Sequence, residues 1–101
     1  MLEKEIEKRV CDYAKEKGLL VYKFTSPARA AVPDRLFITK TGKVFFIEFK
    51  RGGKVATPQQ EREHERLENY KVNVFVIDDF VKGKLVIDLM VDKHVNSQSI
   101  A

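Results

Sequence analysis

The stretch VPDRLFITKTGKVFFIEFKRG, residues 32–52, decides the fold. It holds two segments rich in Phe, Ile and Val, at residues 35–39 and 44–50, which are joined by the turn sequence KTGK. Two short β-prone runs around a tight turn are typical of a β-hairpin, and Gly42 can supply the positive φ that such a turn needs. The stretch therefore predicts two antiparallel strands.

The hairpin places two acids opposite each other. A turn centred near Gly42 puts Asp34 across from Glu48, with roughly 5 Å between their Cβ atoms, where like charges are destabilising. A protein can leave such acids in solvent, pair each of them with a base, or hold a hard cation between them. Mg²⁺ is usually bound by one or two carboxylates together with water and phosphate oxygens.

Lys50 lies beside the acids in this arrangement, because residues two apart on a strand share a face. In a metal-dependent phosphodiesterase, a neighbouring ammonium group neutralises charge that develops on the phosphate. The structural alternative makes Asp34 a turn residue, and Glu48 and Lys50 a surface ion pair. However, an ionisable group inside VFFIEFK is costly to desolvate unless it is paired or binds a metal. This cost favours the metal site.

The remaining segments predict two helices and further strands. Apolar residues recur at spacings of three and four over residues 2–17, which is typical of an amphipathic helix. Thr57 as N-cap and Pro58 at the first helical position predict a second helix that reaches about Tyr70. The other segments are a strand at 19–24, a loop at 25–33, a strand at 72–77 expected inside the sheet, and a hairpin or irregular strand pair at 80–91. The order αβββαβ predicts an α/β fold with a mixed sheet flanked by helices.

Length and composition predict a single small soluble domain. The chain has 101 residues, of which 44% are hydrophobic and 34% charged. No apolar run approaches the ~20 residues of a membrane span, and the charged N-terminus lacks the apolar segment of a secretory signal. Cys11 is the single cysteine, so we expect neither an internal disulfide nor a cysteine zinc site. We expect an intracellular domain at residues 1–93 and a flexible polar tail at residues 94–101.

The charge distribution suits a polyanionic partner. The net charge is +4, and an excess of this sign attracts nucleic acid, although a basic cluster can also be only a solvated face. Hydroxyl and basic side chains lead to Asp34 or follow the hairpin, and their donors suit contacts to phosphate. The candidate DNA-binding residues are Lys23, Thr25, Ser26, Arg29, Arg51 and Lys54.

The two acids and the lysine also form a known signature. Pro33 and Asp34, followed by Glu48, Phe49 and Lys50, match the PD and ExK pattern of the PD-(D/E)xK nuclease superfamily. The blocks KFTSPARAAVPDR, GKVFFIEFKRGGK, TPQQEREHERL and VNVFVID together resemble a minimal VRR-NUC domain, a virus-type replication-repair nuclease. The loop before the PD departs from the family pattern, because it reads ARAA where glycines are usual. The resemblance implies a restriction-endonuclease-like mixed sheet.

The resemblance also implies roles for the residues of the pattern. Asp34 and Glu48 would bind Mg²⁺ or Mn²⁺, the backbone carbonyl of Phe49 would be a third ligand, and Lys50 would be the catalytic lysine. Gln60 matches the family's glutamine on the second helix, where it would hold water or phosphate.

The family's first-helix glutamate has two candidates in this chain. Glu7 fits both its spacing to a following apolar residue and its distance from the glycine that closes the helix, whereas Glu3 fits only the first. We therefore expect Glu7 to serve the site, with Glu3 as the alternative. His64 and His94 are assigned no catalytic role.

For function, the resemblance implies a Mg²⁺- or Mn²⁺-dependent endodeoxyribonuclease that cuts branched DNA, such as Holliday junctions or flaps, in DNA repair. It further implies a homodimer in the cytoplasm of a bacterial cell or phage-infected host. The apolar run LVIDLMV, residues 85–91, could supply the dimer interface or complete the core. Two other classes remain open, namely a non-catalytic nucleic-acid-binding module on the same fold and a small structural or assembly protein.

Overall fold

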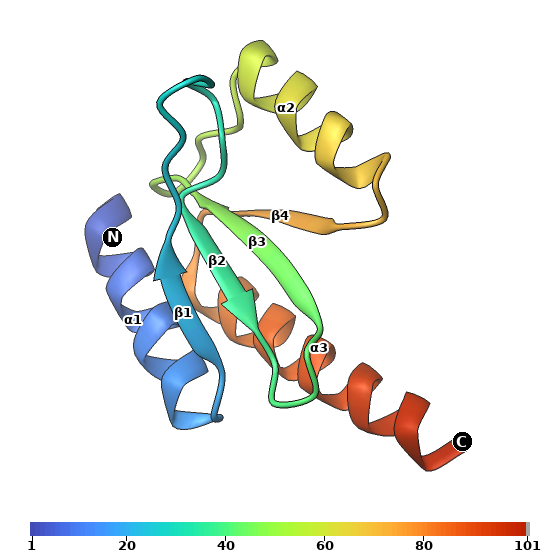
Figure 1. Ribbon diagram of the computed structural model, residues 1–101. Helices are drawn as coiled ribbons and strands as arrows, with labels where there is room; N and C mark the ends of the chain where they lie inside the picture. The colour runs from blue at the N-terminus through green and yellow to red at the C-terminus, as the bar shows by residue number, and fades with distance from the viewer. Residues whose placement is uncertain (101) are drawn as a thin grey trace.

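Four strands form one mixed sheet in the order β1-β2-β3-β4, and three helices surround it (Figure 1). The computed structural model describes residues 1–100, and side chains for residues 1–91. The tail predicted at residues 94–101 lies outside the residues whose side chains are described. The elements are α1 (Glu3–Glu16), β1 (Leu20–Lys23), β2 (Arg35–Ile38), β3 (Val44–Phe49), α2 (Pro58–Glu68), β4 (Asn73–Ile77) and α3 (Phe80–Ile100). None of the helices, as far as they are described, is long and apolar enough to cross a membrane.

The predicted hairpin is confirmed by the pairing of β2 with β3. The two strands are antiparallel, and their register pairs Arg35 with Ile47. The next position of the same register brings Asp34 to Glu48, as the turn sequence predicts. Gly42 has a φ of 95° in the turn, a conformation that glycine adopts without strain.

Strand β4 is at the edge of the sheet, so its predicted interior position is wrong. Within residues 1–100 it pairs with β3 alone, to which it is parallel. Its charge-free sequence reflects helices on both faces rather than strands on both sides, since α3 and α2 both contact it. Phe75 packs against the hydrophobic core, and Ile77 belongs to it. Val76, on the other face, stays 39% exposed.

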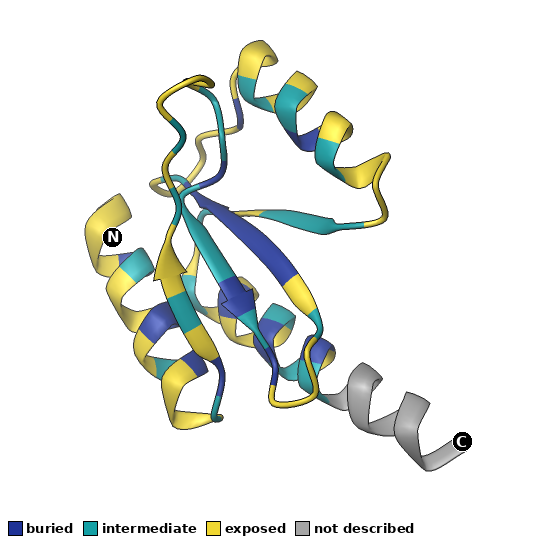
Figure 2. Ribbon diagram, viewed as in Figure 1, coloured by how far each residue is buried: buried dark blue, intermediate teal, exposed yellow. Residues whose placement is uncertain are grey.

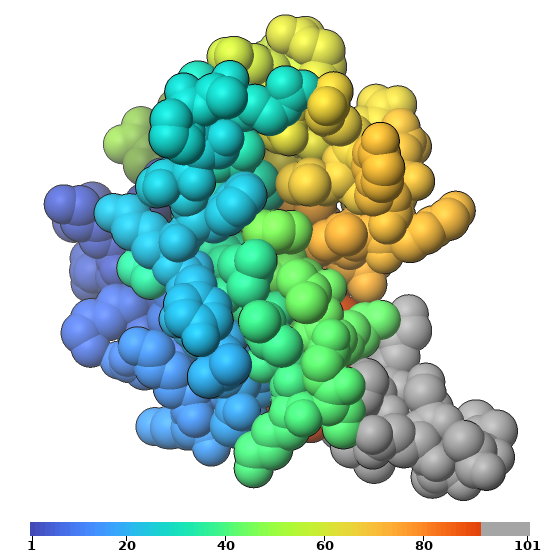
Figure 3. Space-filling model, in the orientation of Figure 1, coloured from blue at the N-terminus to red at the C-terminus, as the bar shows by residue number. Residues whose placement is uncertain are grey.

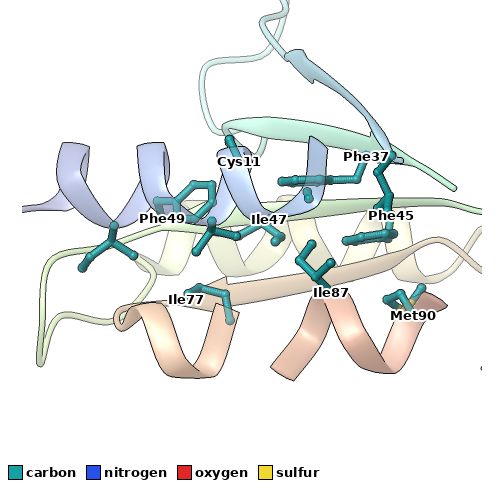
Figure 4. Packing of buried hydrophobic residues seen from close by; sticks show 12 residues of the cluster. Cys11, Phe37, Phe45, Ile47, Phe49, Ile77, Ile87 and Met90 are labelled. Carbon is teal, nitrogen blue, oxygen red and sulfur yellow. The ribbon is translucent and has the colours of Figure 1, made fainter. Parts of the chain in front are cut away.

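The hydrophobic core lies between the sheet and the pair α1 and α3 (Figure 4). Phe45, Ile47 and Phe49 are fully buried there, which confirms the predicted alternation along β3. The rings of Phe37 and Phe45 stack with 5.0 Å between their centroids. Burying one such ring contributes roughly 1.5–3 kcal/mol. Cys11 of α1 lies in the same cluster, and burial raises the pKa of its thiol to about 11, as expected for an unreactive core residue.

Residues 80–91, expected to form a hairpin or strand pair, belong instead to helix α3. The sequence hides the helix because apolar residues occupy both of its faces, so no helical period stands out. Asp79 caps it by accepting a hydrogen bond from the backbone N–H of Lys82. Gly83 marks a close helix contact and not a turn, because a Cβ atom there would lie 2.4 Å from Cγ2 of Val10 on α1. Tertiary packing therefore overrides the local turn signal.

The opposite face of the sheet is covered unevenly. Helix α2 packs near β4, while in the described part of the chain β1 has no helix over this face (Figures 1 and 2). Leu20 and Tyr22 of β1 are 54% and 52% exposed, whereas Val21, which points the other way, packs against the core. Glu48 shares this second face, since its strand neighbours Ile47 and Phe49 point into the core. The acid pair therefore lies on the side of the sheet that α2 only partly covers.

Candidate active site

Asp34 is fixed at the open end of the hairpin by backbone contacts. Its carbonyl oxygen accepts a hydrogen bond of 2.9 Å from the backbone N–H of Phe24. Its side-chain Oδ2 accepts one of 2.8 Å from the backbone N–H of Phe49. Pro33, just before it, is fully buried. Neighbours on both sides along the sheet thus hold the Asp34 carboxylate beside the end of β3.

Glu48 is a buried acid next to Asp34. Glu48 is only 3% exposed. Burial, followed by the charge of Asp34 and a hydrogen bond with its side chain, raises the pKa of Glu48 from 4.5 to about 8. The predicted proximity of the two acids is therefore confirmed, because the charge and side chain of Asp34 act directly on Glu48.

Gln60 reaches Glu48 from the first turn of α2. Thr57 caps this helix by accepting a hydrogen bond from the backbone N–H of Gln60, as predicted. The Gln60 side chain closes the capping box, since its Oε1 accepts from the backbone N–H of Thr57 at 2.9 Å. Its Nε2 then donates to Oε2 of Glu48 at 3.2 Å. Gln60 thus holds a carboxylate oxygen, a contact that the sequence did not reveal.

His64 is a site residue that the sequence analysis missed. It is buried, 6% exposed, and its Nε2 lies 3.5 Å from Oε1 of Glu48. Burial lowers the pKa of His64, so the ring is neutral near pH 7. The available signal was its spacing of four residues from Gln60, which puts both side chains on one face of α2. The charged residues on both sides of His64 in the sequence are typical of a solvent-exposed helix, so burial of His64 was not expected.

The donor set around Glu48 fits a divalent cation. Oε1 of Glu48 and Nε2 of His64 are both buried and have no hydrogen-bond partner within the described part of the chain. A buried carboxylate oxygen without a partner is costly unless an ion or a proton satisfies it. Among residues 1–91, no three His, Cys, Asp or Glu side chains gather as a metal cluster. A cation held by two carboxylates, one backbone carbonyl and waters suits this arrangement.

Lys50 follows directly after β3. Its backbone N–H donates to the carbonyl oxygen of Ile77 at 2.9 Å, which fixes the chain where β3 ends. Its positive charge lowers the pKa of Glu48, against the larger effects of burial and of Asp34. It also lowers the pKa of His64. The ammonium group therefore acts electrostatically on Glu48, and the catalytic role expected of Lys50 stays a prediction.

The two first-helix glutamates differ in their surroundings. Oε2 of Glu7 accepts a hydrogen bond of 2.7 Å from Nε of Arg35. Glu3 carries no such pairing among the described residues, and its charge is one of those that raise the pKa of Glu48. Both glutamates line a groove of about 370 Å³ together with Asp34. The structure thus ties Glu7 to Arg35, whereas Glu3 lines the groove with Asp34 and acts on Glu48 through its charge.

The candidate DNA-binding residues fall into two places. One set lies along the groove that contains Asp34 and consists of Lys23, Thr25, Ser26 and Arg29. Lys54 instead lines a cavity of about 610 Å³ between α2 and β4. Arg51 is exposed on the loop that follows Lys50. The structure brings the first set together beside the acids and separates Lys54 from it.

Comparison with known proteins identifies the family. No family model matches the chain. A solved structure described as "VRR_NUC domain" superposes with a TM-score of 0.79 and 32% sequence identity, over 85% of this chain and 94% of that chain. The chain belongs to the VRR-NUC nuclease family. A phage protein named "Putative nuclease p44", from Acyrthosiphon pisum secondary endosymbiont phage 1, is 43% identical over 76 residues, which are 75% of this chain and 82% of that protein.

A second solved structure shares the VRR-NUC fold. It is described as "VRR_NUC domain protein" and has a TM-score of 0.71 and 20% identity, over 87% of this chain and 86% of that chain. These similarities confirm the resemblance found in the sequence and the α/β fold with its mixed sheet. They give the VRR-NUC assignment a structural basis that is independent of the short PD and ExK motifs.

Proposed function

We propose that this VRR-NUC protein is a Mg²⁺- or Mn²⁺-dependent endonuclease that hydrolyses phosphodiester bonds in DNA. The observation that carries the proposal is the acid pair of Asp34 and Glu48, in which a nearly fully buried carboxylate has one oxygen without a hydrogen-bond partner in the described structure. A module that only binds nucleic acid gains nothing from clustered acids beside a phosphate. A cation explains both the burial and the clustering.

Each residue of the site has a proposed role. Asp34, Glu48 and the backbone carbonyl of Phe49 would hold the cation, which when bound supplies Lewis-acid activation of the phosphate and of water. Lys50 would neutralise charge that develops on the phosphate oxygens during cleavage. Gln60 would keep Glu48 in place through the 3.2 Å hydrogen bond.

The flanking residues would complete the site. Glu3 lines the groove with Asp34 and its charge raises the pKa of Glu48, and we propose it as the first-helix glutamate in place of Glu7. Glu7 would instead hold Arg35 at the wall of the groove. Polar and basic side chains of the groove would contact the phosphate backbone, which positions DNA without reading its sequence. These are Lys23, Thr25, Ser26 and Arg29, with Arg51 and Lys54 on the loop after β3.

We further propose that the protein acts as a homodimer on branched DNA. Support comes from helix α3, where Ile87 and Met90 complete the core, while Val81, Leu85 and Leu89 are 61%, 62% and 56% exposed. Their spacing of four residues forms an apolar stripe on the outer side of the helix, and such stripes mark interaction sites. Two protomers would bring two active sites to one branched substrate.

Replacing Leu85 with lysine is expected to convert the dimer to a monomer. In a symmetric interface each substitution occurs twice, and each lost leucine costs roughly 1.5–3 kcal/mol of burial. The dissociation constant should therefore rise roughly 100-fold or more. Light scattering and sedimentation at several concentrations give the mass, with Val55→Lys as control, since Val55 is 77% exposed on the loop between β3 and α2 and is not part of the stripe. A native chain that is monomeric, or a Leu85→Lys chain that dimerises normally, would contradict the interface.

The nuclease proposal is tested by cleavage of a four-way junction, a flap and plain duplex DNA. We expect the native chain to cut with Mg²⁺ or Mn²⁺, to favour the branched substrates, and to be inactive with a chelator. Asp34→Ala, purified in parallel, controls for contaminating nucleases and should be inactive under all conditions. DNA binding without cleavage in every metal condition would favour the non-catalytic binding module instead.

A further inference from the structure

Helix α2 separates its charges onto two sides. Its acidic residues Glu61, Glu65 and Glu68 line the cavity beside β4. Arg62 and Arg66, four residues apart, line a different pocket, which lies between α2 and the loop at residues 25–33. Figure 3 shows this loop and α2 side by side on the face of the molecule that is in view. The helix thus presents a basic edge to the loop before Asp34.

The arginines of this pocket outnumber its acids. Arg29, Arg62 and Arg66 line it, and Glu63 is the acid among its lining residues. Oε1 of Glu63 pairs with Nε of Arg29 at 3.2 Å, which ties the loop to the helix. Within residues 1–91, neither Arg62 nor Arg66 has an ion pair or a hydrogen bond from its side chain. Like charges four residues apart on a helix are mutually destabilising, so an anion between them is favoured.

The pocket has the size and walls of a phosphate site. Its volume is about 470 Å³, within the range that small groups occupy in proteins. The opposite wall consists of small residues, Ala28, Ala30 and Ala31, which leave the guanidinium groups accessible. A guanidinium group donates two parallel hydrogen bonds to a phosphate, which suits a negatively charged diester better than a neutral ligand. The loop sequence ARAA thus supplies Arg29 and three small side chains to this pocket.

The pocket also adjoins the active site. Arg29 and Ala30 line both this pocket and the groove that contains Asp34. Gln59 lines the pocket and directly precedes Gln60, whose side chain contacts Glu48. A nucleic-acid strand with one phosphate at the acid pair would pass the loop and meet the arginines next.

We propose that the pocket of Arg29, Arg62 and Arg66 binds a backbone phosphate of the DNA that flanks the cleaved bond. The proposal rests on the function proposed above and adds a second contact point for the same DNA. It makes the loop at residues 25–33 the divider between the reacting phosphate and the flanking one. The glutamates of α2 on the side that faces β4 repel DNA from that side of the helix, so the strand leaves the active site toward the arginines.

The test compares two double variants that each remove two positive charges. Arg62→Ala/Arg66→Ala changes the pocket, whereas Lys15→Ala/Lys40→Ala changes exposed lysines on α1 and in the β2–β3 turn, at the other end of the molecule (Figure 1). Binding of a fluorescent flap DNA is measured by anisotropy with a chelator present, over a range of salt concentrations. Alanine has the highest helix propensity, so the exposed α2 positions tolerate the change.

We expect the arginine pair variant to bind roughly 10- to 100-fold more weakly. The slope of log K against log salt should shrink by about 1 to 2, because phosphate contacts are lost. The lysine pair variant should change the slope by clearly less. Equal slopes and affinities for the two variants would overturn the pocket. Cleavage by the native chain is decided separately by the metal assay, so failure of the nuclease proposal is not confused with failure of the pocket.

Discussion

Replacing Glu48 with glutamine is expected to reduce cleavage by roughly 10³-fold or more, and to make the metal-free protein more stable at pH 8. The loss of activity follows because an amide does not replace an anionic metal ligand, and metal activation is worth several kcal/mol. The gain in stability follows from burial, which with the neighbouring charge of Asp34 raises the pKa of Glu48 to about 8. A neutral glutamine avoids the cost of ionising this position.

The sign of the pH dependence is fixed by the two states of Glu48. The unfolded chain releases the proton near pH 4.5 and the folded chain near pH 8. Between these values the folded state holds more protons, so the contribution of Glu48 to the free energy of unfolding falls by about 1.4 kcal/mol per pH unit. The full contribution is present below pH 4.5 and is lost as the pH rises through 8. The lowered pKa of His64 makes the free energy of unfolding rise with pH. This effect is common to the native and Glu48→Gln chains, so it does not change the difference between them.

Urea unfolding at pH 5, 6, 7 and 8 with a chelator measures this effect. The difference between native and Glu48→Gln chains should grow with pH, whereas Glu65→Gln, at an exposed position of α2, should follow the native chain. Added Mn²⁺ at 100 times its dissociation constant should stabilise the native chain by about 2.7 kcal/mol and leave Glu48→Gln unchanged. Parallel pH curves for native and Glu48→Gln chains would contradict the raised pKa of Glu48 in the folded chain.

Local sequence signals predicted those parts of the molecule that local geometry decides. The turn around Gly42 specified the hairpin register, and the register brought Asp34 to Glu48. Thr57 and Pro58 specified the start of α2. In each case the signal lies within a few residues of the structure that it determines, so neighbours distant in sequence do not alter it.

Signals that depend on tertiary packing were not visible in the sequence. Gly83 and the apolar residues around it resembled a turn between strands, but they form a helix because α1 approaches closely at Val10. The edge position of β4 depends on where the chain crosses over the sheet, which its own residues do not encode. His64 became a site residue only when α2 was placed over Glu48. The different surroundings of Glu3 and Glu7 likewise depend on a tertiary contact, the pairing of Glu7 with Arg35.

Replacing Lys50 with methionine is expected to lower the rate of cleavage by roughly 10²–10³-fold, with little change in metal or DNA affinity. Methionine keeps the length and apolar stem of lysine but removes the charge that would stabilise the phosphate as it reacts. Single-turnover cleavage at saturating DNA measures the rate. Mn²⁺-induced stabilisation and anisotropy in chelator measure the two affinities. Lys40→Met is the matched control, since it makes the same substitution at an exposed position in the β2–β3 turn.

The pH profile distinguishes a direct role of Lys50 from an indirect one. The charge of Lys50 lowers the pKa of Glu48, so its removal raises that pKa further. The metal-binding carboxylate then forms only at a higher pH. If this were the whole effect, raising the pH would return the Lys50→Met chain to the native rate. If Lys50 acts on the phosphate, the rate stays low at every pH and at saturating metal. We expect the second result. Recovery of the native rate at high pH would show instead that Lys50 acts only by lowering the pKa of Glu48.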